Sequence, residues 1–195
     1  MSLLLQTGLI VFSGLPIVAT ALLGYQLLRN GQGAIGKPPI TAWLFYFTKF
    51  TIAFLLLSLF LASLKEDFFH YFPWLIQNKI PEVQRLLGLV FVFAGNLLLI
   101  PAYYSLSIFT RMGLPTKEHA LQTKGVYKIS RNPMYTSFFF YYLACFLIIP
   151  SLLIAVLIAL NLLTHHFIIL NEEKYLANSF PKDYTSYKEN TARYL

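Results

Sequence analysis

A run of 37 residues, from Met134 to Leu170, contains no Lys, Arg, Asp or Glu. Unpaired backbone polar groups are costly in hydrocarbon, so an apolar run of this length is expected to form helix inside a bilayer. One span takes roughly 20 residues, and Pro150-Ser151 interrupts the run near its middle. The sequence therefore predicts two tightly joined helices. The charges that flank the run, Arg131 before it and Glu172-Glu173 after it, should then meet on one face of the membrane.

Three more stretches are apolar and long enough to cross a bilayer: residues 3–28, residues 40–64, which carry only Lys49, and residues 86–109. Charged residues make up 12% of the chain, about half of the share that is usual in soluble domains. The first stretch lacks a basic start and is too long for a signal peptide, so we expect it to remain in the mature protein. We predict an all-α polytopic membrane protein with about five transmembrane helices, a tight helical hairpin and a cytosolic C-terminal helix. It should form a single membrane-embedded domain over residues 1–195.

The distribution of basic residues predicts the orientation. Residues 110–133 hold five Lys and Arg residues against one Glu, whereas residues 65–85 carry balanced charges. Basic loops stay in the cytosol, so the N-terminus should lie outside and the C-terminus and active site in the cytosol. The net charge of +7 indicates contact with anionic membrane lipid. Nucleic acid is not an expected partner, because the basic residues are dispersed among the spans, and no obligate protein partner is evident.

Four residues of the last apolar stretch share one helical face: Asn161, His165, Ile168 and Glu172. Polar side chains inside a span usually face the bundle interior or a water-filled cavity. Asn161 and His165 fit a structural hydrogen-bond network between helices as well as a functional site. Glu172 on its own also fits a solvated charge at a helix end.

The segment Arg131-Asn132-Pro133 is typical of a helix start, with Asn132 as the N-cap and Pro133 in the first position. Free N–H groups at a helix start can bind a carboxylate or a phosphate. Arg131, Lys124 and Lys128 are also explained as basic residues that mark the cytosolic side. The two interpretations are compatible.

Several short motifs follow one another in the second half. They are His119-x-Leu121, Gly125-x-Tyr127, Arg131-x-Pro133-x-Tyr135, Glu172-Glu173, Phe180, Tyr184, Tyr187 and Arg193. In this order and spacing they resemble the integral-membrane methyltransferases, which include isoprenylcysteine carboxyl methyltransferases and phospholipid methyltransferases. The resemblance runs from His119 to the end of the chain, with Asn132 in place of a usual His and Pro181 in place of a usual Gly. It implies S-adenosylmethionine as cofactor, held between the loop before the fourth span and the tail helix.

We therefore divide the domain into a three-helix scaffold, residues 1–109, and a cofactor-binding and catalytic half, residues 110–195. By the resemblance, the cofactor contacts fall on His119, Ala120, Leu121, Gln122, Tyr127, Asn132, Pro133, Met134, Tyr135, Glu172 and Glu173. An acid such as Glu172 can pair with the ammonium of the cofactor or accept from a ribose hydroxyl. Aromatic faces suit its sulfonium group. No metal site is expected.

Three residues are candidates for catalysis: His165, Arg131 and Arg193. An amine or thiol acceptor must first lose a proton, which His165 could take, whereas a carboxylate needs no base. Prenylcysteine methyltransferases have an Arg for the substrate carboxylate where this chain has Ile168. Arg131 or Arg193 would have to replace it, so the identity of the acceptor stays open.

The expected function is S-adenosylmethionine-dependent methyl transfer to a lipid-like or small hydrophobic acceptor at the cytosolic membrane face. One alternative is an NADPH-dependent membrane reductase of the sterol-reductase type, which shares a similar Gly-x-Tyr and Arg-x-Pro-x-Tyr region. Those reductases are generally longer, and the acid pair is not a feature that we associate with them. A second alternative is a non-catalytic membrane scaffold or small transporter. It would distribute polar residues through several spans, whereas here they cluster at one face.

Overall fold

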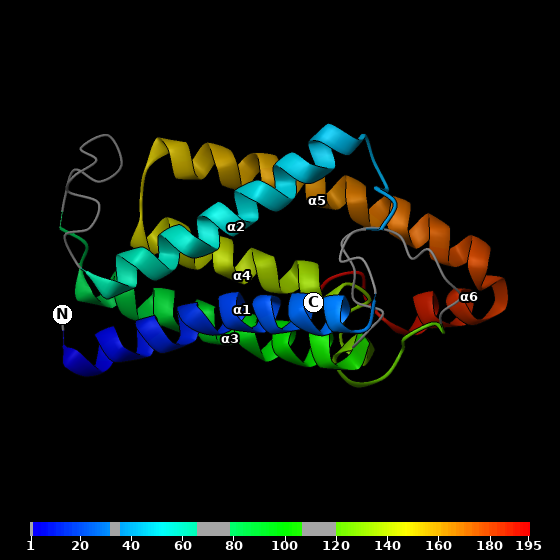
Figure 1. The fold of residues 1–195 in the computed structure, drawn as a ribbon, viewed down its shortest axis with the longest axis horizontal. Coiled ribbons are helices and arrows are strands. Elements are labelled where there is room, and N and C mark those ends of the chain that lie inside the picture. Colours follow the sequence, from blue (N-terminus) through cyan, green and yellow to red (C-terminus); the bar gives the residue numbers. More distant parts are fainter. Residues whose placement is uncertain (1, 32–35, 66–78, 107–119) are drawn as a thin grey trace.

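All regular elements of the described residues are helices in this computed structural model, which describes residues 2–31, 36–65, 79–106 and 120–195. The elements are α1 (Leu3–Arg29), α2 (Ala42–Leu64), α3 (Glu82–Leu106), η3 (Gly125–Lys128), α4 (Pro133–Ile148), α5 (Leu152–Ser179) and α6 (Pro181–Asn190). Figure 1 shows α1 to α5 running lengthwise through one bundle, with α6 at the end opposite the N-terminus. The predicted all-α class is confirmed.

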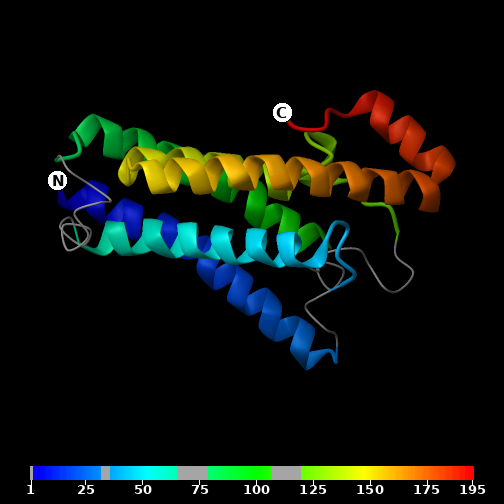
Figure 2. The same cartoon turned by 90° about the horizontal axis from the view of Figure 1, so that it is seen from above.

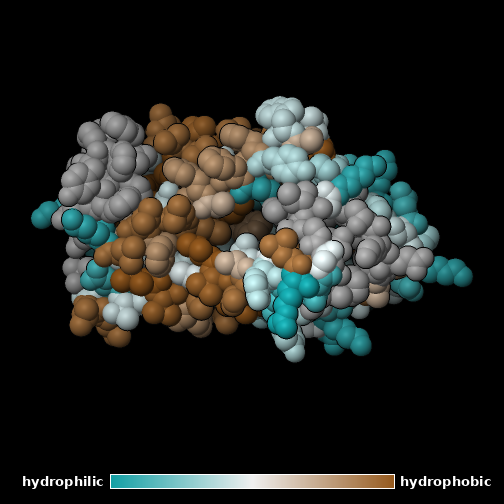
Figure 3. Space-filling model, in the orientation of Figure 1, coloured by the Kyte–Doolittle hydropathy of each residue, from teal (hydrophilic) through white to brown (hydrophobic). Residues whose placement is uncertain are grey.

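Four of the five bundle helices, α1, α2, α3 and α5, are long and apolar enough to cross a membrane. The fifth, α4, is also apolar but has only 16 residues, a length of about 24 Å. Figure 3 shows a hydrophobic surface over the middle of the bundle and hydrophilic residues towards both of its ends. This surface is the one expected of a multi-pass membrane protein. Which end faces the cytosol stays a prediction.

The predicted hairpin is present, and Ser151 shapes it. Its Oγ accepts a hydrogen bond from the backbone N–H of Ile154 at 3.2 Å and so caps the start of α5. The helix α5 then runs on past Glu172-Glu173 and ends at Ser179. Pro181 opens α6 in the first helical position, where its missing N–H is tolerated. Figure 2 shows α6 folding back beside α5, so that the C-terminus returns towards the bundle.

Two glycines let α3 approach α4 closely. A Cβ atom on Gly95 would lie 2.8 Å from Tyr141 Cε1, and one on Gly88 would lie 2.8 Å from Ile148 Cδ1. Small residues commonly allow such contacts between membrane helices. The Tyr141 hydroxyl donates to Asn96 Oδ1 at 3.0 Å, and this hydrogen bond joins the two helices further. The bundle is therefore held together by backbone proximity as well as by apolar packing.

The polar stripe on α5 faces inwards, as the sequence predicts. Asn161 and His165 are 1% and 4% exposed, and Ile168 is fully buried. The amide of Asn161 donates to Thr51 Oγ1 in α2 at 2.7 Å, and its Oδ1 accepts from the Tyr142 hydroxyl of α4 at 3.4 Å. Asn161 thus connects three helices. The structural interpretation of this residue is confirmed, and the network also fixes the surroundings of His165.

Candidate active site

The start of α4 lies at the predicted position, but Asn132 does not cap it with its side chain. The Asn132 amide donates instead to Glu173 Oε1 at 3.1 Å and to the carbonyl of Arg193 at 3.2 Å. The predicted N-cap residue and the proline that follows it are confirmed, but the Asn132 side chain is oriented towards Glu173 and makes no capping bond. Pro133 has no N–H. The N–H groups of Met134 and Tyr135 lie in the first turn, so they have no partner within the helix, and no side chain caps them.

Glu173 accepts hydrogen bonds from several polar groups next to this helix start. Its Oε1 accepts from Arg131 Nε and Nη2, each at 3.2 Å, and its Oε2 accepts from Arg193 Nη2 at 2.9 Å. The side chains of Glu173 and Arg131 are 9% and 7% exposed. The hydrogen bond to Glu173 raises the pKa of Arg193. Both oxygens of the Glu173 carboxylate therefore accept hydrogen bonds from protein donors.

Arg131 also holds the last residues of the chain. Its Nη1 donates to the carbonyls of Lys188 and Thr191, and its backbone N–H donates to the carbonyl of Ala192 at 2.9 Å. Both arginines that the sequence marked as catalytic are thus bound to Glu173 and the tail. Their catalytic roles, and that of Glu173 as a cofactor contact, stay predictions that this geometry does not favour.

Glu172 has very different surroundings from its neighbour. Among the described residues its carboxylate receives one hydrogen bond, from the Tyr135 hydroxyl to Oε1 at 2.9 Å. Lys49, from α2, interacts electrostatically with it, and the Lys49 ammonium lies 5.3 Å from the centre of the Tyr135 ring. Most of the acceptor capacity of Glu172 is therefore available to a ligand.

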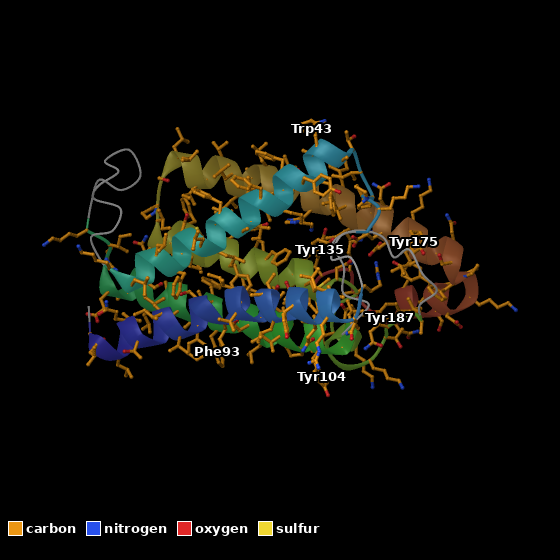
Figure 4. The ribbon with its side chains drawn as sticks, viewed as in Figure 1. Trp43, Phe93, Tyr104, Tyr135, Tyr175 and Tyr187 are labelled. Atoms are coloured by element: carbon orange, nitrogen blue, oxygen red, sulfur yellow. The ribbon has the colours of Figure 1, made fainter. Side chains whose placement is uncertain are left out.

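The segment before α4 is shaped by Gly125, whose φ of +63° is readily adopted only by glycine. The turn of η3 that follows buries Tyr127, and the carbonyl of Tyr127 accepts from the Tyr187 hydroxyl of α6. Burial raises the pKa of the Tyr127 phenol, which stays neutral. Figure 4 shows Tyr135 and Tyr187 on the same half of the molecule. Phe93 and Tyr104 point outwards, away from the interior of the bundle.

The remaining predicted cofactor contacts precede η3. Ala120 is exposed, Leu121 is half-buried, and Gln122 turns its amide to the carbonyl of Ser105 at 3.3 Å. His119 lies outside the described residues. The structure thus brings Tyr127, Asn132 to Tyr135 and Glu172 to one end of the bundle.

A cavity of about 370 Å³ lies between α4 and α5 next to this cluster. Most of its wall is aromatic or aliphatic, and its lining residues are Tyr135, Thr136, Phe139, Phe140, Tyr142, Leu162, His165, His166, Ile169, Tyr194 and Leu195. Phe139 and Leu162 are each about two-fifths exposed, 44% and 39%. The cavity therefore extends from the half-buried Tyr135 to residues that reach the outer surface of the bundle.

His165 lines this cavity and is the candidate base. Its Nδ1 lies 3.0 Å from the Tyr142 hydroxyl, and its Nε2 is buried without a hydrogen-bond partner in the part of the chain that the structure describes. The Asn161 amide donates to Thr51 and Leu157, so its Oδ1 is an acceptor for the Tyr142 hydroxyl. The Tyr142 proton can serve only one of the two. Every group of this network except Nε2 is satisfied when Nδ1 of His165 carries the proton, and Nε2 is then a free acceptor.

Sequence reasoning missed Lys49, which belongs to the half predicted to be only a scaffold. It is the one charged residue of α2, and an ionisable residue inside a span is by default a functional candidate. That signal was present in the sequence. The Tyr142 contact and the cavity, in contrast, depend on side-chain packing that no motif marks.

A family model for phospholipid methyltransferases matches residues 83–183, which run from the start of α3 into α6. The match includes the start of α4, His165 and both acids of the cluster. Comparison with curated proteins and with solved structures gave no match. The family match spans more than half of the 195 residues and confirms the resemblance seen in the motifs. This chain belongs to the phospholipid methyltransferase family.

Proposed function

We propose that this protein transfers a methyl group from S-adenosylmethionine to a lipid-like or small hydrophobic acceptor at the cytosolic membrane face. The observation that carries the proposal is the Tyr135–Glu172 hydrogen bond of 2.9 Å, which joins the start of α4 to the end region of α5. It places a largely free carboxylate beside uncapped backbone N–H groups. Family membership supports the reaction class.

The residues at this junction fit the polar groups of the proposed cofactor. Glu172 can accept from an ammonium or a ribose hydroxyl, because one protein donor leaves it with free lone pairs. The N–H groups of Met134 and Tyr135 can donate to an anionic group at the helix start. The aromatic faces of Tyr127 and Tyr135 can contact an adenine or a sulfonium group. S-adenosylmethionine, when bound, supplies a methyl group on a positively charged sulfur.

The cavity between α4 and α5 is the proposed acceptor site. Its volume of about 370 Å³ and its mostly apolar lining suit part of a lipid-like molecule. Tyr135 lines the cavity and also contacts Glu172, so it connects the acceptor site with the cofactor site. The protein would then act mainly by aligning the two reactants and excluding water.

We propose that His165 takes the proton of an amine or thiol acceptor. Its Nε2 is a free acceptor when Tyr142 accepts from Nδ1, and the side chain lines the cavity. The hydroxyl of Tyr142 would also hold the ring in this tautomer. An acceptor that is already anionic would not need His165.

Arg131 and Arg193 have a different proposed role. Both guanidinium groups are bound to Glu173, and together they hold the tail against the start of α4. We propose that they close the site and do not touch the reacting atoms. Tyr194, which follows Arg193, lines the acceptor cavity, so loss of this anchoring would also disturb the acceptor site.

The test compares ligands of the two possible cofactor classes. Purified protein in lipid nanodiscs is titrated calorimetrically with S-adenosylhomocysteine and, separately, with NADPH. Transfer of a labelled methyl group is then followed in native lipid extract. The proposal expects binding of S-adenosylhomocysteine and labelled lipid. Binding of NADPH without S-adenosylhomocysteine would replace it with the reductase alternative, and binding of neither would support a non-catalytic role.

A further inference from the structure

Lys49 is a half-buried cation whose hydrogen-bonding capacity is unused among the described residues. Its ammonium lies 5.1 Å from the centre of the Phe45 ring and 5.3 Å from that of Tyr135. Within the described residues it donates no hydrogen bond and forms no ion pair of contact distance. Aromatic faces attract a cation, but they leave the three N–H donors of an ammonium without oxygen acceptors.

The direction of the Lys49 side chain distinguishes it from a lysine that reaches outwards to water. Phe45, one turn earlier on α2, is fully buried, and Tyr135 belongs to α4. A side chain in contact with both rings points into the bundle, where a charge is costly unless it is paired. A ligand that brings its own negative charge would offset this cost.

Tyr135 separates Lys49 from the nearest acid of the site. Its ring faces the Lys49 ammonium, and its hydroxyl donates to Glu172 Oε1 at 2.9 Å. The two opposite charges interact electrostatically but do not form a direct ion pair. The Tyr135 side chain thus contacts both a cation and an anion. Among the described residues, each of these two groups can still form further hydrogen bonds.

We propose that Lys49 and Glu172 form a binding site for a zwitterion, in which Lys49 binds the anionic group and Glu172 binds the ammonium. The inference rests on the proposed function and deepens it. Two ligands of the reaction carry this chemistry. One is the amino-acid end of the methyl donor, with a carboxylate and an ammonium. The other is a phospholipid headgroup with a phosphate and an amine.

The experiment uses Lys49→Met, which removes the charge and keeps an unbranched apolar side chain in the span. Calorimetry in nanodiscs measures the affinity for S-adenosylhomocysteine and for 5′-methylthioadenosine, which lacks the amino-acid end. It also measures the affinity for short-chain phosphatidylethanolamine and for an alkylamine of equal chain length without phosphate. Lys49→Arg keeps the charge, and Lys37→Met makes the same change at an exposed lysine outside the spans.

Lys49→Met is expected to lower the affinity for one of the two zwitterions about tenfold or more and to leave its anion-free counterpart unchanged. Loss for S-adenosylhomocysteine identifies the donor carboxylate, and loss for phosphatidylethanolamine identifies the lipid phosphate. Lys49→Arg should retain most of the affinity, and Lys37→Met should match the wild type. A purely structural role would instead lower both members of a pair equally, together with the melting temperature.

The inference is overturned if both zwitterions bind Lys49→Met as they bind the wild type, or if the anion-free ligands lose as much affinity. In that case wild-type binding of S-adenosylhomocysteine would still uphold the proposed function. If the wild type itself does not bind S-adenosylhomocysteine, the proposed function fails. The two failures are therefore distinguishable.

Discussion

Tyr135 donates a hydrogen bond to Glu172 across the junction of α4 and α5, with 2.9 Å between the phenol oxygen and Oε1. The residues are 37 positions apart, and the tight turn between the helices brings them together. This contact aligns the carboxylate beside the start of α4. It is the structural basis for the proposed cofactor site, because it leaves the second carboxylate oxygen free of protein donors in the described part of the chain.

Replacing Tyr135 with Phe removes this hydrogen bond and keeps the ring that faces Lys49. We expect the affinity for S-adenosylhomocysteine to fall several-fold, because Glu172 loses the donor that orients it. Calorimetric titration measures the change. Tyr104→Phe is the matched control, since Tyr104 is 88% exposed at the end of α3. Equal losses in both variants would show that the hydrogen bond does not orient the carboxylate.

The two neighbouring acids should respond in opposite ways to neutralisation. Glu173→Gln leaves Arg131 and Arg193 without a charged partner, and breaking a buried pair costs about 3–5 kcal/mol. We therefore expect a clearly lower apparent melting temperature in detergent. Glu172→Gln should change the melting temperature little and lower cofactor affinity. The reverse pattern would assign the ligand role to Glu173.

His165→Gln tests the proposed base. With an amine acceptor, we expect methyl transfer to slow about 10²–10⁴-fold, while the affinity for S-adenosylhomocysteine stays near that of the wild type. Cys145→Ala is the control, because Cys145 is equally buried but does not line the cavity. Unchanged turnover in His165→Gln would remove the base from the account and favour an acceptor that needs no deprotonation.

Gly95→Ala tests the close contact of α3 and α4. The added methyl group would meet the Tyr141 ring at 2.8 Å, and moving that ring disturbs its hydrogen bond to Asn96. We expect a loss of about 1–3 kcal/mol in stability, seen as a lower melting temperature. Gly24→Ala is the control, since nothing lies within 4 Å of its added Cβ atom. A melting temperature as high as that of the control would contradict the close contact.

The apolar pattern and the prolines predicted most of the fold. Apolar stretches located α1, α2, α3 and α5, and Pro150 located the hairpin turn. The helix α5 continues past the acids to Ser179, and α4, which ends before Pro150, has only 16 residues.

The motifs predicted which residues converge but not how each one is used. Glu172 and Glu173 are adjacent on α5, so successive side chains point in directions about 100° apart. One faces Tyr135 and the other faces Arg131, and the sequence does not distinguish them. Asn132 is the predicted N-cap, but the sequence does not show that its amide donates to a carboxylate 41 positions away.

The most direct measurement of the central claim is the affinity of Glu172→Ala for S-adenosylhomocysteine, with Glu189→Ala as the matched control. Glu189 is an exposed acid on α6. We expect the wild type and the control to bind with equal affinity and Glu172→Ala to lose detectable binding while it keeps its melting temperature. Full affinity in a folded Glu172→Ala protein would show that the donor is not bound where the start of α4 meets α5.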